Sequence, residues 1–199
     1  MAVFVQAVGF LASPHASAGQ ENEQEPALEW LAGAYSFSDE LGGFVIESVS
    51  GSGTQEDPIV VTETFASSSP VTLVIRTKRP IRPFDDGTLY ANGILYMRVV
   101  VRNGSGQGWV EFEFELQERL HQPSIFSDGL SFDQRSEKSD EISSDAYDKY
   151  SRDFEPYDKL LFHDGKVDPG ETAGFSFLIT DYTPKSVFYL VQDPRIPST

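Results

Sequence analysis

The feature that most constrains the fold is a period-two alternation of apolar and polar side chains, repeated in short runs along the chain. The clearest run is residues 109–117 (WVEFEFELQ), in which apolar side chains alternate with glutamates and a glutamine. Because successive side chains of a strand point to opposite faces, this run predicts a strand with an apolar core face and a carboxylate-bearing outer face.

Seven further runs of this kind are separated by segments rich in Gly, Pro, Asp and Ser, and no alternation of strands with helices appears. The chain of 199 residues fits one domain, and its fifteen Phe, eight Tyr and two Trp supply the apolar surface of one core. We therefore predict an all-β fold, an antiparallel β-sandwich of the Ig-like or jelly-roll kind. The eight predicted strands are residues 43–50, 58–65, 71–77, 94–102, 109–117, 157–162, 173–180 and 186–192.

Two segments depart from this pattern. Residues 136–158 (SEKSDEISSDAYDKYSRDFEPYD) form a long acidic insertion, in which Ile142, Ala146 and Tyr150 recur every four residues. That spacing predicts a short amphipathic helix inside the insertion. A polar leader and a second short helix are predicted in residues 19–40, before a sandwich domain over residues 41–199.

The N-terminus is typical of an export signal. Residues 2–12 (AVFVQAVGFLA) are uncharged and mostly apolar, and they lead to the small residues of Ala16-Ser17-Ala18. We predict a signal peptide over residues 1–18 and a periplasmic or extracellular product that begins at Gly19. No basic residue follows Met1, which departs from the usual signal, and the alternative is a buried first strand or helix. No later stretch approaches the roughly 20 apolar residues of a membrane helix.

Charge is the next constraint. The formal net charge is −16, so the whole molecule should repel nucleic acid and anionic lipid. No Lys or Arg precedes Arg76, whereas residues 76–102 carry six bases and two acids. This basic island is a candidate anion or polysaccharide site. The alternative is that its cations neutralise the protein's own acidic surface. The candidate anion-binding residues are Arg76, Lys78, Arg79 and Arg82.

Calcium is the most reasonable metal for this sequence, and no other cofactor is predicted. The chain has no Cys, which excludes thiolate sites and disulfides, whereas calcium prefers oxygen ligands from acidic loops. Two segments qualify, within residues 140–158 and 164–171, although neither matches an EF-hand loop. The candidate ligands are Asp140, Asp145, Asp148, Asp153, Glu155, Asp158, Asp164, Asp168 and Glu171.

Catalytic residues are not assigned. Only His121 and His163 follow the predicted signal, and no G-x-S-x-G motif is present, so a catalytic triad is unsupported. Glu111, Glu113 and Glu115 share one face of a strand, which leaves paired-carboxylate chemistry open. A solvated outer face explains the same pattern, and we favour that explanation.

Residues 167–181 (VDPGETAGFSFLITD) resemble the late strand pair of exported bacterial Ig-like β-sandwich proteins, in which a Pro-Gly-Glu turn precedes an alternating Phe strand. Residues 51–54 and 57–59 are similar to the same group, and the two stretches together cover about 22 residues. The resemblance implies the fold and export, and it implies no catalytic residue.

Three functions remain open. The main hypothesis is an exported, non-enzymatic β-sandwich that acts as a binding or structural module for an extracellular protein or glycan. The second is a calcium-dependent carbohydrate-binding module, and the third is a glycan-active enzyme with paired carboxylates. An enzyme is the less favoured class.

Overall fold

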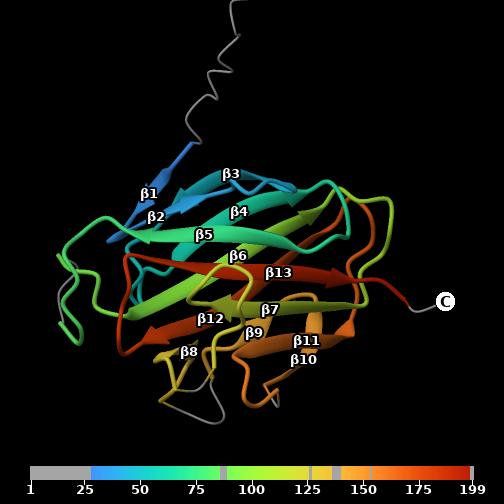
Figure 1. The fold of residues 1–199 in the computed structure, drawn as a ribbon. Coiled ribbons are helices and arrows are strands. Elements are labelled where there is room, and N and C mark those ends of the chain that lie inside the picture. The colour runs from blue at the N-terminus through green and yellow to red at the C-terminus, as the bar shows by residue number, and fades with distance from the viewer. Residues whose placement is uncertain (1–27, 86–88, 126, 136–139, 153, 198–199) are drawn as a thin grey trace, which may run out of the picture.

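In a computed structural model, the protein forms two β-sheets that pack face to face as a sandwich (Figure 1). The structure describes residues 28–85, 89–125, 127–135, 140–152 and 154–197, and these contain strands, turns and no helix. The predicted all-β sandwich is confirmed. The predicted signal peptide, residues 1–18, lies outside the described residues.

The first sheet has seven strands in the order β1-β2-β5-β13-β7-β11-β10. Every neighbouring pair in it is antiparallel. The strands are β1 (Trp30–Ala32), β2 (Tyr35–Ser38), β5 (Val71–Thr77), β7 (Glu111–Gln117), β10 (Tyr147–Ser151), β11 (Lys159–Gly165) and β13 (Val187–Arg195).

The second sheet has six strands, in the order β3-β4-β6-β12-β8, with β9 also pairing β12. Its β4–β6 pair is parallel and the others are antiparallel. That parallel pair arises because the chain crosses to the other sheet as β5 before it returns as β6. The strands are β3 (Phe44–Ser50), β4 (Ile59–Phe65), β6 (Ile94–Asn103), β8 (Leu130–Phe132), β9 (Ser143–Ser144) and β12 (Thr172–Asp181).

All eight strands predicted from the alternation are present, as β3, β4, β5, β6, β7, β11, β12 and β13. The other strands are β1, β2, β8, β9 and β10, and each is only two to five residues long. Strands this short contain too few alternations to show a period in the sequence.

Both predicted helices are wrong. The described part of the segment 19–40, residues 28–40, contains β1 and β2, and the acidic insertion contains β9 and β10. The spacing of Ile142, Ala146 and Tyr150 did not identify a helix, because residues four apart share a face in a strand as well as in a helix. Tyr147 and Tyr150 anchor the insertion: Tyr147 stacks on Phe175 at 5.9 Å, and Tyr150 lies 6.4 Å from Phe162 between ring centroids.

The core is filled by aromatic rings from both sheets. Phe112 and Phe114 of β7 are fully buried, as the alternation predicts. Phe112 lies 4.6 Å from Phe175 of β12, and Phe114 lies 5.0 Å from Phe177, between ring centroids. These contacts join the two sheets across the sandwich, and rings in such arrangements contribute beyond the area that they bury.

A buried polar loop closes the turn between β6 and β7. Asn103 is fully buried: its Nδ2 donates to the carbonyls of Gln107 and Val167 at 2.8 and 3.0 Å. Its Oδ1 accepts from the backbone N and the hydroxyl of Ser105 at 3.0 and 2.7 Å. The hydroxyl of Ser105 also accepts from Nε1 of the buried Trp109 at 3.2 Å. This network fixes the loop against the core.

In the part of the chain that the structure describes, no helix has the length and apolar character needed to cross a membrane.

Candidate functional site

The chain leaves β5 at one end of the sandwich (Figure 1, left). The segment that follows carries exposed apolar and cationic side chains. Residues 78–84 (KRPIRPF) are all exposed, and we call this segment the exposed ribbon. The turn between β12 and β13, residues 182–186, lies at the same end. The island that stood out by charge is therefore also a place where apolar side chains face solvent.

Backbone hydrogen bonds hold the exposed ribbon in place. The N–H of Arg82 donates to the Ala91 carbonyl at 3.0 Å, and the N–H of Ala91 donates to the Pro80 carbonyl at 3.0 Å. The N–H of Phe84 donates to the Asn92 carbonyl at 3.1 Å. Two prolines further restrict the backbone dihedral angles. The ribbon is thus ordered before any ligand arrives, which lowers the entropic cost of binding.

Phe84 is presented to solvent in an unfavourable backbone conformation. Its φ is 60°, a left-handed value that is uncommon for a bulky residue, and its side chain is 60% exposed. The ring lies 5.4 Å from that of Tyr182, which is 39% exposed. Left-handed backbone costs a non-glycine residue about 1–2 kcal/mol. Such strain tends to persist at functional sites.

Arg82 lies on the same ribbon. Its guanidinium carbon is 5.1 Å from the centroid of the Tyr90 ring, and its Nε is 3.5 Å from Oδ2 of Asp85. The side chain remains 63% exposed. Stacking on an aromatic face holds a guanidinium group in a preferred orientation without covering its outer edge.

The other candidate anion-binding residues differ from Arg82. Arg76 donates two hydrogen bonds to Glu40, at 2.9 and 2.6 Å, which lower the pKa of that carboxyl. Lys78 pairs with Glu29 at 2.5 Å. Arg79 is exposed and also has an interaction within the chain. The cations nearest to β5 therefore neutralise the protein's own acids, as the alternative interpretation predicts.

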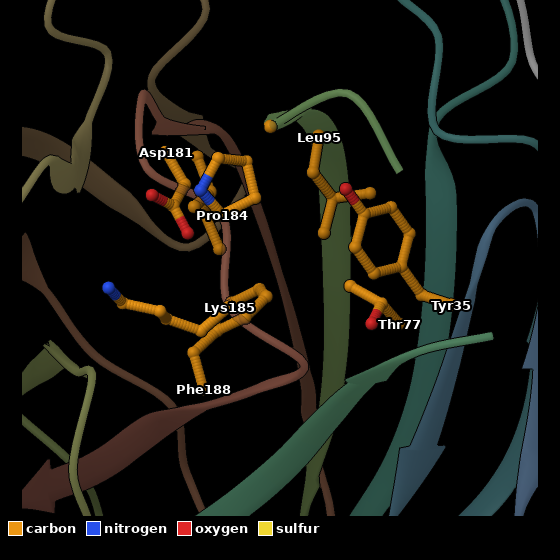
Figure 2. Close-up of a pocket in the computed structure, with 9 residues that line it drawn as sticks. Tyr35, Thr77, Leu95, Asp181, Pro184, Lys185 and Phe188 are labelled. Atoms are coloured by element: carbon orange, nitrogen blue, oxygen red, sulfur yellow. The ribbon is translucent and has the colours of Figure 1, made fainter. Parts of the chain in front are cut away.

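A small pocket lies beside the ribbon, between the two sheets (Figure 2). Tyr35 lines one side and Asp181 the other, with Leu95 and Pro184 between them in this view. Burial raises the pKa of Tyr35 to about 12 and also raises the pKa of Asp181. The cavity volume is about 10 Å³, enough for about one water molecule and far below the size of a substrate pocket.

The candidate calcium ligands that the structure describes are dispersed. Asp145 accepts from Arg98 at 2.8 Å and from the Gly174 N–H at 2.6 Å. Asp164 pairs with Lys149 at 2.6 Å, which lowers the pKa of Asp164.

The remaining candidates do not converge either. Asp168 pairs with Lys166 at 2.5 Å, and Glu171 accepts from the Asp168 N–H at 2.9 Å. Burial raises the pKa of Asp158 to about 6. Asp140, Asp148 and Glu155 are exposed, and Asp153 lies outside the described residues. Among the described residues no three His, Asp or Glu side chains are placed to hold a metal ion, so calcium binding stays a prediction.

The carboxylates of β7 are part of an ion-pair network across three strands. Glu113 accepts from Lys159 of β11 at 3.1 Å and from Arg195 of β13 at 2.5 Å. Glu115 lies 2.7 Å from the same lysine. The side chains of Glu113 and Glu115 are only 7% and 12% exposed, so the outer face is less solvated than the sequence suggests. Ion pairs with cations of the neighbouring strands explain why these glutamates alternate along β7, and no catalytic role is needed to explain them.

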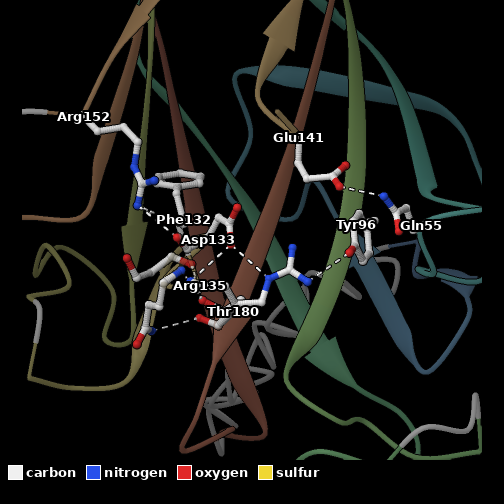
Figure 3. A network of polar contacts seen from close by, with 10 residues as sticks. Gln55, Tyr96, Phe132, Asp133, Arg135, Glu141, Arg152 and Thr180 are labelled. Atoms are coloured by element: carbon white, nitrogen blue, oxygen red, sulfur yellow. Dashed lines mark hydrogen bonds and ion pairs between the residues drawn. The ribbon is translucent and has the colours of Figure 1, made fainter. Parts of the chain in front are cut away.

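A second polar network lies on the outer side of the six-stranded sheet (Figure 3). Arg135 donates to Asp133 at 3.1 Å and to the Tyr96 hydroxyl at 3.2 Å, and its guanidinium carbon is 5.8 Å from the Tyr96 ring centroid. Arg152 of the acidic insertion donates to the Phe132 carbonyl. Arg152 therefore ties the insertion to β8, and Arg135, which directly precedes the insertion, contacts Tyr96 of β6.

One buried pair was missed by the sequence analysis. Glu63 of β4 and Gln192 of β13 are fully buried and come from opposite sheets. The Gln192 amide lowers the pKa of Glu63, but burial has the larger effect and raises this pKa to about 8. Among the residues that the structure describes, no hydrogen bond of normal geometry satisfies either side chain. Each residue occupies a core position in its alternating run, and this signal in the sequence could have revealed the pair.

Phe84 and Tyr182 were also missed as site residues. An aromatic residue directly after a basic, proline-rich segment is a weak signal, and nothing local indicates that Tyr182 approaches it. No family model, no curated protein and no solved structure matches this chain. The assignment of a site therefore depends on the geometry of these residues.

Proposed function

We propose that this protein is an exported, non-enzymatic binding module whose glycan ligand docks on the exposed ribbon and Tyr182. The observation that carries the proposal is Phe84: a bulky aromatic side chain held in solvent by an ordered backbone with a φ of 60°, against a second exposed ring. A residue that adopts an unfavourable backbone conformation, and whose side chain does not pack in the core, is typical of a binding surface. The small volume of the neighbouring pocket favours binding over catalysis.

The ribbon also has the shape that a module of this kind needs. It connects a strand of one sheet to a strand of the other at the end of a rigid sandwich, where binding loops commonly occur. Exposed apolar side chains that gather in one place favour an interaction site over ordinary surface. The calcium-dependent alternative has weaker support, because its described candidate ligands are dispersed and several are paired with cations.

Substitution of Phe84 tests this proposal. We expect Phe84→Asn to weaken binding to a microarray of neutral and acidic glycans by about tenfold or more, since it removes the apolar ring. The free energy of unfolding should change by less than about 1 kcal/mol, because asparagine tolerates left-handed backbone and this gain offsets the lost ring contact.

Leu31→Ala is the matched control, since Leu31 is 69% exposed on β1 and does not belong to the ribbon. It should leave glycan binding unchanged. The proposal is overturned if the wild-type protein binds no glycan on the array, or if Phe84→Asn binds as tightly as Leu31→Ala.

Export has its own test. The apolar run 2–12 and the small residues 16–18 predict cleavage after Ala18. When the full chain is expressed in a secreting bacterial host, the intact mass of the exported material should correspond to a protein that begins at Gly19. Exported protein that retains Met1 would contradict the predicted signal peptide.

A further inference from the structure

The ribbon and its neighbours offer two different kinds of contact at adjacent positions. Phe84 and Tyr182 provide apolar faces, and their rings are tilted by 49° and lie 5.4 Å apart. Ile81, in the same ribbon, is 40% exposed. Rings arranged in this way can hold the apolar face of a sugar ring and exclude water from it.

Arg82 provides the second kind of contact, which is charged. Its interactions among the described residues use the guanidinium face, over Tyr90, and Nε, beside Asp85. The outer edge of the guanidinium group, with its two Nη atoms, can therefore receive a ligand. That edge matches a carboxylate, which accepts two parallel hydrogen bonds from it.

The net charge of −16 does not prevent an anion from binding here. Exposed charges farther than about 8 Å are largely screened at physiological ionic strength. The ribbon carries three cations, Lys78, Arg79 and Arg82, and two of them pair with nearby acids, Lys78 with Glu29 and Arg82 with Asp85. These five groups keep an excess of one positive charge, so a ligand at Arg82 meets a locally cationic segment of an acidic molecule.

We infer that the ligand is an acidic polysaccharide built of uronate units. One sugar ring lies against Phe84 and Tyr182, and the carboxylate of this or the next unit pairs with Arg82. The inference rests on the proposed function and specifies the chemistry of its ligand. It also explains why an acidic protein keeps its one cationic segment beside exposed aromatic side chains.

Polygalacturonate tests the inference, with dextran as a neutral polysaccharide. Binding of the full mature chain is measured by affinity gel electrophoresis with EDTA present, so that calcium makes no contribution. We expect the wild-type protein to bind polygalacturonate and to ignore dextran. Arg82→Gln should weaken this binding about tenfold, the usual scale for the loss of a charged hydrogen bond. Phe84→Asn should weaken it by a similar or larger factor.

Arg102→Gln is the matched control. Arg102 is an exposed arginine of the same basic island, near the far end of β6, and its substitution changes the net charge by the same amount. We expect this variant to bind polygalacturonate like the wild type. Circular dichroism melts of all three variants should resemble that of the wild type, which shows that lost binding does not reflect unfolding.

Three outcomes would overturn the inference, and they differ in what they leave standing. Binding to dextran that needs Phe84 but not Arg82 removes the acidic ligand and leaves the glycan-binding function intact. Equal losses in Arg82→Gln and Arg102→Gln show diffuse electrostatic attraction in place of a site. Binding to neither polysaccharide, together with an empty glycan array, removes both the inference and the proposed function.

Discussion

Raising the pH from about 5 to about 9 should lower the free energy of unfolding by about 3–5 kcal/mol through Glu63 alone. This carboxyl has a pKa of about 8 in the folded protein against an ordinary value of 4.5. Between these two values the folded chain binds one more proton than the unfolded chain. Stability from Glu63 is therefore complete below about pH 4.5 and is lost as the pH rises through about 8.

The physical cause is the burial of Glu63 between the sheets. When protonated, the side chain can remain in the core opposite Gln192 without a charge. When ionised, it pairs with no cation of the described part of the chain, and Asp39 raises its pKa further. Burying an unpaired carboxylate is costly, so a protein at high pH must hold this charge in its core or unfold.

Glu63→Gln separates this group from every other titration. We expect urea unfolding curves of the variant to exceed the stability of the wild type by about 3 kcal/mol at pH 9 and to match it within about 1 kcal/mol at pH 5. Glu47→Gln, an exposed carboxylate on β3, is the control and should keep the pH dependence of the wild type. Parallel pH profiles of Glu63→Gln and the wild type would show that Glu63 does not carry the effect.

Asn103→Ala should destabilise the protein by about 3–4 kcal/mol, which corresponds to a fall in Tm of about 6–16 °C for a chain of this size. The substitution removes four hydrogen bonds from a buried loop and leaves the Ser105 N–H without the acceptor it has there. The carbonyls of Val167 and Gln107 keep their second donors, the Trp109 N–H and the Ser105 hydroxyl. It also loosens Ser105, which accepts from the buried Trp109.

Differential scanning calorimetry measures this effect, with Gln107→Ala as the control. Gln107 belongs to the same loop, but its side chain is exposed and accepts a hydrogen bond from the Ser68 hydroxyl at 2.7 Å. Its substitution should change the free energy of unfolding by less than about 0.5 kcal/mol. Similar losses in the two variants would mean that the buried network of Asn103 does not stabilise the loop.

Much of the fold could be predicted from local pattern. Phe112, Phe114 and Leu116 are fully buried, as their positions in the alternating run require. The same pattern could not show that Glu113 and Glu115 lie beneath Lys159 and Arg195, because those cations come from other strands. The helix expected around Ala146 failed for a related reason: a spacing of four fits either element, and only pairing with neighbours decides between them.

Only the location of the candidate site could be predicted from the sequence. The basic island marked the segment, since charge is visible in composition. The ion pairs that distinguish Arg76 and Lys78 from Arg82 were not predictable. They depend on Glu29 and Glu40, which are brought to β5 because β2 pairs with β5 and β1 pairs with β2.

The sequence by itself determined the eight long strands and their core faces, because the alternation of side chains along a strand is a local property of the backbone. The tertiary structure alone decided which strands pair, including the parallel β4–β6 pair, and which charges meet. It also brought Phe84 to Tyr182 and Glu63 to Gln192. Each of these contacts joins segments far apart in the chain, and such contacts depend on how the two sheets pack and not on any pattern within one segment.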